Sequence, residues 1–169
     1  VHLPPTLNLV LAEKAQQDTF VKLLIDLIQN MEQLNPTGYV LHLGPNPPTL
    51  LPKPSKYLYA DTTINLDYWY QLSFNILEHL QTATNLGLRL LLENLDFSPL
   101  LLRPFLQQGF AGLCLDIGHL WLGREPITNT FYLLQEYIGE IHLHGVADYE
   151  EHLSLQKTDE TKLEELAGV

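Results

Sequence analysis

Apolar positions along the chain alternate between helix-like spacing and short continuous runs. Between residues 13 and 34 the apolar side chains recur three and four positions apart, which predicts an amphipathic helix. Helix spacing or helix boundary residues also mark the segments 66–86, 98–109, 126–139 and 159–167. The short apolar runs that precede these helices predict strands at 1–3, 39–43, 88–93, 111–116 and 140–144. The pattern therefore predicts five βα units.

Strands that alternate with helices predict an α/β fold with parallel strands and right-handed crossovers. Five such units fit either a doubly wound open sheet or part of a (β/α)8 barrel. The absence of a Gly-rich phosphate loop after the expected strands disfavours a dinucleotide-binding sheet. Five prolines exclude a helix from residues 45–65, so we expect a long loop there.

Each expected strand ends in a residue that can bind a metal ion. These residues are His2, His42, Glu93, Asp116 and His142. We expect them to converge, because the C-terminal ends of parallel strands build the active sites of α/β proteins. Imidazole and carboxylate groups together suit Zn²⁺, Mn²⁺ or Fe²⁺. The set is larger than one metal ion needs, which favours a site with more than one ion.

Side chains alternate along a strand, so Ile141 and Leu143 should pack under helices while His142 and His144 point into the site. Long loops are functional or disordered, and we interpret residues 45–65 as a Pro-rich active-site loop, with a disordered surface excursion as the alternative. The expected substrate-binding residues are Lys53, Lys56, Tyr57, Arg124 and His144. We expect Cys114 to be a small packing residue.

The composition of the chain argues against several classes of function. The 169 residues fit one domain, and their net charge of -11 comes from 9 Lys and Arg against 20 Asp and Glu. Such a chain lacks the basic patch of a duplex-DNA-binding protein. It has no apolar run approaching the ~18 residues of a membrane span. One cysteine excludes an internal disulfide and is compatible with a reducing, cytoplasmic location.

Several strings resemble the xylose isomerase-like barrel superfamily, which includes sugar isomerases, epimerases and endonuclease IV. The strings are Val-His-Leu-Pro at 1–4, Tyr-Val-Leu-His-Leu at 39–43, Glu-Asn-Leu-Asp-Phe at 93–97, Cys-Leu-Asp-Ile-Gly-His-Leu at 114–120 and Ile-His-Leu-His-Gly-Val at 141–146. Their order, together with His152-Leu-Ser-Leu, most resembles the cobamide-remodelling phosphodiesterases (CbiR-type). The resemblance implies a partial (β/α)8 TIM barrel, with residues 1–169 as a single, incomplete domain that corresponds to strands 3–7.

The same resemblance implies a metal-dependent hydrolase that cleaves a phosphoester in the nucleotide loop of a cobamide and releases cobinamide. One to three Zn or Mn ions would supply the hydroxide, and Glu93, Asp116 and His142 would be the catalytic residues. The implied metal ligands are His2, His42, Glu93, Asp116, His119, His142 and His152, with Glu150 as a further candidate. The alternatives are a sugar isomerase or epimerase, an abasic-site DNA nuclease like endonuclease IV, and a barrel module without catalysis. The expected partner is a small-molecule substrate rather than nucleic acid or a membrane.

Overall fold

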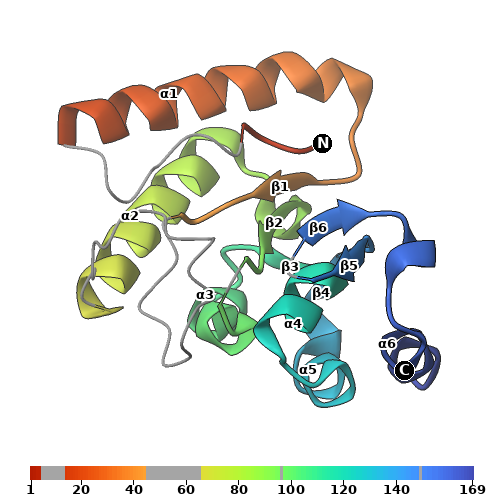
Figure 1. The fold of residues 1–169 in the computed structure, drawn as a ribbon. Coiled ribbons are helices and arrows are strands. Elements are labelled where there is room, and N and C mark those ends of the chain that lie inside the picture. Colours follow the sequence, from red (N-terminus) through yellow and green to blue (C-terminus); the bar gives the residue numbers. More distant parts are fainter. Residues whose placement is uncertain (5–13, 45–65, 96, 149) are drawn as a thin grey trace.

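The computed structural model describes residues 1–4, 14–44, 66–95, 97–148 and 150–169, and its centre is a parallel four-stranded sheet (Figure 1). The strands lie in the order β1-β2-β3-β4. Their bounds are β1 Tyr39–Leu41, β2 Leu90–Glu93, β3 Gly112–Asp116 and β4 Ile138–His142. Residues 1–3 run parallel beside β1, where the Leu3 amide donates to the Val40 carbonyl at 2.9 Å. The five segments that were expected to be strands therefore lie side by side, in the same order as they follow one another in the sequence.

This order decides between the two expected architectures. A doubly wound sheet reverses its strand order at a switch point, whereas a barrel adds each strand beside the preceding one. The described sheet has no reversal, so the fold is α/β with the strand order of a partial barrel. A buried layer of Val40, Leu91 and Cys114 lies on its inner face. Two residues further along the same strands come His42, Glu93 and Asp116, which places these three at one rim.

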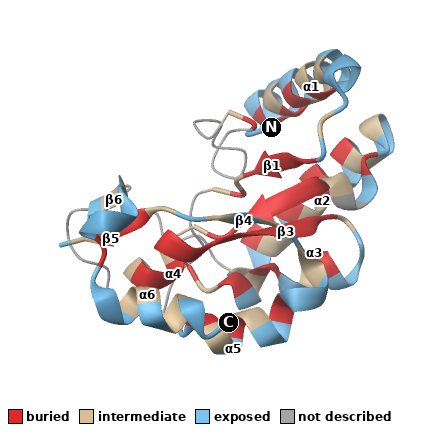
Figure 2. Cartoon of the chain, turned by 90° about the vertical axis from the view of Figure 1, so that its right-hand side faces the viewer, coloured by how far each residue is buried: buried red, intermediate tan, exposed pale blue. Residues whose placement is uncertain are grey.

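Six α-helices are present in the described parts of the chain; α1 and α2 lie side by side next to β1 and β2, whereas α4, α5 and α6 lie beside β4 and the hairpin that follows it (Figure 1). Their bounds are α1 Lys14–Met31, α2 Leu66–Thr84, α3 Arg103–Gln107, α4 Ile117–Gly123, α5 Ile127–Leu134 and α6 Glu160–Ala167. Strands β1, β2 and β3 are buried along their whole length, whereas α1 and α2 each bury only one face (Figure 2). Between α2, α3 and the sheet, Trp69 packs edge-to-face on Phe105 with a centroid distance of 5.5 Å. None of the helices described here is long and apolar enough to cross a membrane.

Two elements were not expected from the sequence. Helix α4 begins directly after β3, and an antiparallel hairpin of β5 Gly145–Ala147 and β6 Glu150–Leu153 follows β4. Gly139, expected to end a helix, instead lies inside β4, and the register between β3 and β4 shifts there. A Cβ atom at Gly139 would lie 2.7 Å from a methyl group of Leu91. The glycine is thus required by a bulge and a close side-chain approach rather than by a helix end.

A second expectation that the structure corrects concerns the outer face of β4. Ile141 and Leu143 were expected to pack under helices, but they are 51% and 44% exposed. β4 is the edge strand of the described sheet, and α5 packs against α4 and α6 rather than over β4. The alternation of side chains along the strand holds, but none of the described helices covers its outer face. The expected loop at 45–65, with Lys53, Lys56 and Tyr57, lies outside the described residues.

Candidate metal centre

Three imidazoles converge on the carboxylate of Glu93 at the end of β2. His2 Nε2 lies 3.0 Å and His42 Nε2 2.7 Å from Glu93 Oε2, and His142 Nδ1 lies 2.7 Å from Oε1. Glu93 is only 4% exposed. Burial alone would raise its pKa, but the hydrogen bonds and charges of His42 and His142 outweigh burial and lower the pKa well below its usual range. Glu93 is therefore ionised and is the central acceptor of the site.

His142 lies between two carboxylates. Its Nδ1 contacts Glu93, and its Nε2 lies 3.1 Å from Oε1 of Glu140, two residues earlier on the same face of β4. Burial lowers the pKa of His142, but its hydrogen bonds to these glutamates and the charge of Asp116 together raise it above the ordinary value. His142 therefore connects the carboxylates of Glu93 and Glu140.

A second group forms around Asp116, at the end of β3. Oδ1 of Asp116 accepts the backbone N–H of His119 at 3.0 Å and so caps the start of α4. The Asn94 side chain holds the backbone of Asp116 on both sides: its Nδ2 donates to the Asp116 carbonyl at 3.0 Å, and its Oδ1 accepts the Asp116 N–H at 2.8 Å. Both residues are buried, so β2 and β3 are tied together at the rim.

His144 completes this second group. Its Nδ1 faces both the backbone N–H of His152, at 2.9 Å, and the Gly145 carbonyl, at 3.3 Å. Nε2 lies 3.1 Å from Oδ1 of Asp116, although the angle is not that of a hydrogen bond. Burial lowers the pKa of His144, but the neighbouring Asp116 carboxylate raises it overall. The ring of His152 stacks on that of His144 at 4.3 Å.

The donor sets fit divalent metal ions. His2, His42 and Glu93 form one set, Glu93, Cys114 and His142 a second, and Asp116, His119 and His144 a third; within each set the ligand atoms lie within 4.8 Å of one another. The Asp116–His144 contact is short without being a hydrogen bond, as expected where two ligand atoms face the same cation. Such an ion would replace the protons that hold these groups together here, and it would act as a Lewis acid.

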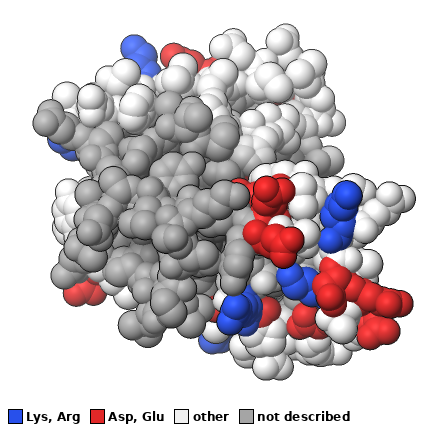
Figure 3. Space-filling model, in the orientation of Figure 1, with Lys and Arg blue, Asp and Glu red and all other residues white. Residues whose placement is uncertain are grey.

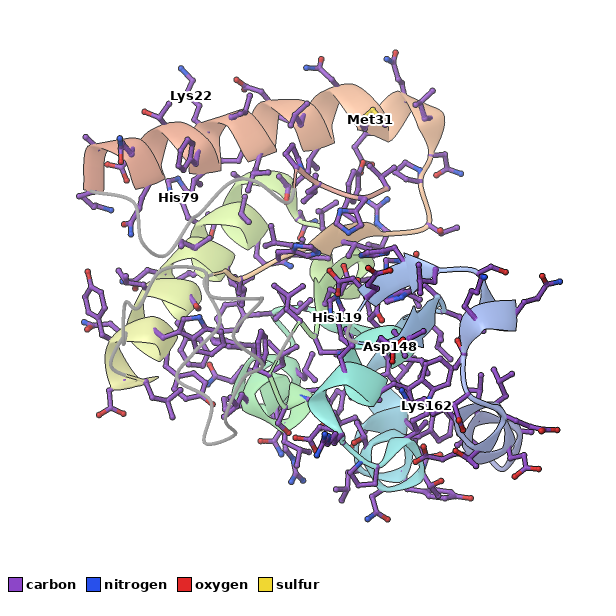
Figure 4. All side chains as sticks on the ribbon, viewed as in Figure 1. Lys22, Met31, His79, His119, Asp148 and Lys162 are labelled. Atoms are coloured by element: carbon purple, nitrogen blue, oxygen red, sulfur yellow. The ribbon has the colours of Figure 1, made fainter. Side chains whose placement is uncertain are left out.

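Most sequence-predicted ligands are brought together, with differences at the hairpin. His152 reaches the second group by ring stacking and is 69% exposed at its side chain. Glu150 is exposed on β6, whereas the neighbouring Glu151 lies 3.6 Å from Nδ1 of His119. Arg124 follows α4 and lines a separate cavity. Figure 4 shows His119 near the centre of the molecule, and His79 well apart from it on α2.

Three residues of the site have roles that were not predicted from the sequence. Cys114, expected to be only a packing residue, also belongs to a donor set with Glu93 and His142. Glu140 precedes His142 by two residues and so lies on the same face of β4, but it was not named as a site residue. Asn94 directly follows Glu93, yet it holds the backbone of Asp116 on the next strand. The parallel register of β2 and β3 could have suggested the pairing of Asn94 with Asp116.

Comparisons with solved structures show what this fold resembles. The chain is similar to 3-keto-D-glucoside 4-epimerase, YcjR, from E. coli (TM-score 0.66, 12% identity, 99% of this chain and 76% of that chain). It is also similar to an L-ribulose 3-epimerase (0.59, 15%, 98% and 65%) and to the TTHB071 protein from Thermus thermophilus, soaked with ZnCl2 (0.57, 22%, 86% and 57%). The chain has the fold of part of a TIM barrel.

These neighbours are 12–22% identical to the chain and show its fold alone, so the superfamily resemblance of the sequence strings stays a prediction. The chain spans less than two thirds of the length of two of them. Comparison with family models and with curated proteins gives no match. The cobamide-remodelling branch of the resemblance and the cytoplasmic location both stay predictions.

Proposed function

We propose that the protein is a divalent-metal-dependent sugar isomerase or epimerase. The observation that carries this proposal is the convergence of His2, His42 and His142 on the buried carboxylate of Glu93, at the active-site rim of a barrel fold. Two of the structural neighbours are sugar epimerases, which supports the same reaction class. A bound metal ion would hold and polarise the carbonyl and hydroxyl oxygens of a sugar.

Epimerisation beside a carbonyl, and isomerisation by the enediol route, need a group that takes a proton from carbon. Glu140 is a candidate for this base. Its carboxylate lies 3.1 Å from Nε2 of His142, is 37% exposed at the side chain, and belongs to none of the three donor sets. A base must reach the substrate rather than be consumed as a ligand. Glu140 meets that condition, because it is accessible and adjacent to the donor groups.

A phosphodiesterase acting on a cobamide is the second candidate function. The observation that favours it is the existence of two donor sets without a shared residue: His2, His42 and Glu93, and Asp116, His119 and His144. Two such sets could hold two metal ions, an arrangement that suits displacement at a phosphoester. In this case Glu140 would not be needed as a base.

The test separates the two functions with one protein and three substrates. The protein, loaded with Mn²⁺ or Zn²⁺, is incubated with a ketohexose, a cobamide and an abasic DNA duplex. We expect an epimeric or isomeric sugar, and no cleavage of the other two. Cleavage of the cobamide without sugar conversion would replace the first proposal by the second, and cleavage of the duplex would refute both.

Variants test the residue roles. Glu93→Gln should lose both metal binding and turnover. Glu140→Gln should keep the bound metal and lose turnover of the sugar. His79→Ala, on the exposed side of α2, is the matched control and should behave like the wild type. Full sugar turnover by Glu140→Gln would exclude Glu140 as the base.

A further inference from the structure

Asn94 is a fully buried residue that directly follows the last residue of β2. Its Nδ2 donates to the main-chain carbonyl of Asp116 at 3.0 Å, and its Oδ1 accepts the Asp116 N–H at 2.8 Å. A side-chain amide carries the same kinds of donor and acceptor as a peptide group, so Asn94 pairs with β3 as a further strand residue would. Burying an amide is costly unless it is hydrogen-bonded, and here both of its polar atoms are bonded to the backbone of one residue of the metal centre.

Asp116 is held at its side chain as well as at its backbone. Its Oδ1 accepts the backbone N–H of His119 at 3.0 Å and lies 3.1 Å from Nε2 of His144. Its other oxygen, Oδ2, lies 3.9 Å from Nδ1 of His142. The same nitrogen of His142 lies 2.7 Å from Oε1 of Glu93. Asp116 therefore faces the Glu93 group across His142, and the position of its backbone fixes the distance between the two donor groups.

The two carboxylates at this junction are buried: Glu93 is 4% and Asp116 1% exposed. Figure 3 shows other acidic side chains at the surface, mixed with basic ones, on the right-hand side of the molecule, where Figure 1 places the hairpin and α6. Exposed carboxylates attract any cation, and salt screens that attraction. A buried carboxylate is costly unless it is compensated, so its position relative to the other donors decides how well a cation is bound. The hydrogen bonds of Asn94 act on that position for Asp116.

We propose that Asn94 is a positioning residue of the metal centre, which holds the Asp116 donor group at the distance from the Glu93 group that a divalent ion requires. Asn94 acts through the backbone of Asp116 and not as a ligand. This inference rests on the metal dependence of the proposed function, but it does not depend on which substrate is converted. Loss of a residue that orients a metal ligand typically lowers metal affinity by about 10–100-fold, so an effect of this size is expected when the amide is removed.

The test separates positioning from stability. Asn94→Ala removes both hydrogen bonds, and Asn94→Ser, which keeps a polar group, takes its place if the alanine variant does not fold. Tyr39→Phe is the matched control, because it also removes two hydrogen bonds of a buried group, those of the hydroxyl with the Ile28 carbonyl and Glu32. Tyr39 comes three residues before His42, roughly 10 Å from the rim along the strand. Each protein is treated with EDTA and titrated with Zn²⁺ against a chromophoric chelator, at a temperature where circular dichroism shows it to be folded.

We expect Asn94→Ala to bind Zn²⁺ about 10–100-fold more weakly than the wild type, and Tyr39→Phe to bind it equally well. In the metal-free proteins, the NMR ring signals of His142 and His144, which face Asp116, should shift in the first variant and not in the second. His79, on α2, is the internal reference. The proposal is overturned if the Asn94 variant binds Zn²⁺ like the wild type, or if Tyr39→Phe loses as much affinity. Since Zn²⁺ binding and not sugar turnover is measured, a protein that binds Zn²⁺ as expected but converts no sugar refutes the proposed function alone.

Discussion

Replacing Gly118 by alanine tests how α4 and His144 together position Asp116. Gly118 lies inside α4, two residues after Asp116. A Cβ atom at this position would overlap the ring of His144, because the ring atoms Cε1, Nε2 and Nδ1 all lie far inside contact distance of it. The alanine therefore cannot be accommodated unless His144 moves away from Asp116.

The size of the effect follows from two opposing terms. Overpacking of a filled site costs about 1–3 kcal/mol. Alanine in a helix is favoured over glycine by ~1 kcal/mol, which offsets part of that cost. We therefore expect Gly118→Ala to lower the free energy of unfolding by no more than ~2 kcal/mol. The effect on metal affinity should be larger, about 10–100-fold or more, because the alanine displaces His144 from the donor set that it forms with Asp116 and His119.

Gly123→Ala is a matched control in the same helix. A Cβ atom there meets only Cγ of Glu125, at 3.7 Å, which is an ordinary contact. This variant should be as stable as the wild type or slightly more stable, with unchanged metal affinity. The assays are thermal unfolding, metal competition titration and the NMR signals of the histidine rings. If Gly118→Ala kept both the His144 signals and the metal affinity of the wild type, the argument would be refuted.

Further predictions concern two hydrogen-bond networks. Tyr39→Phe removes the two hydrogen bonds of a buried hydroxyl group and should cost about 1–3 kcal/mol in urea unfolding. The pKa of Glu32 is lowered by its hydrogen bonds from Tyr39 and Arg89, so its contribution to stability is present above the unfolded value of 4.5 and is lost as the pH falls through the folded pKa. The difference in stability between wild type and Glu32→Gln should therefore shrink in acid, and a constant difference would contradict this. Asn94→Ala should cost about 1–3 kcal/mol, because it removes both hydrogen bonds that the buried amide makes to the backbone of Asp116; unfolding as in the wild type would show that water replaces the amide.

Periodicity was sufficient to predict the main elements of this fold. Helix spacing located α1 and α2, and the apolar runs located the four strands of the sheet to within a few residues. The sequence could not distinguish the glycine of a strand bulge from one that ends a helix, because both need a residue without a side chain. Gly139 was assigned to the wrong class for this reason, and only the approach of Leu91 identifies its role.

The hairpin of β5 and β6 was missed for a different reason. Its strands are 3 and 4 residues long, too short for a clear alternation of polar and apolar positions. As a result, the side of the site that it forms was only partly predicted. His152 was named as a ligand from the resemblance, but its backbone N–H also contacts Nδ1 of His144, which no sequence pattern reports.

The contact between Glu93 and His142 shows how register builds a site that spacing alone cannot reveal. The two residues lie on β2 and β4, with β3 between them. Neighbouring strands are ~4.8 Å apart, so the two backbones are separated by roughly twice that distance. The residue of β3 beside Glu93 is Cys114, whose small side chain leaves room for the glutamate and the imidazole to meet at 2.7 Å. A large side chain in that position would fill the space between them. The small side chain of Cys114, at the centre of the inner face, therefore allows Glu93 and His142 to meet across β3.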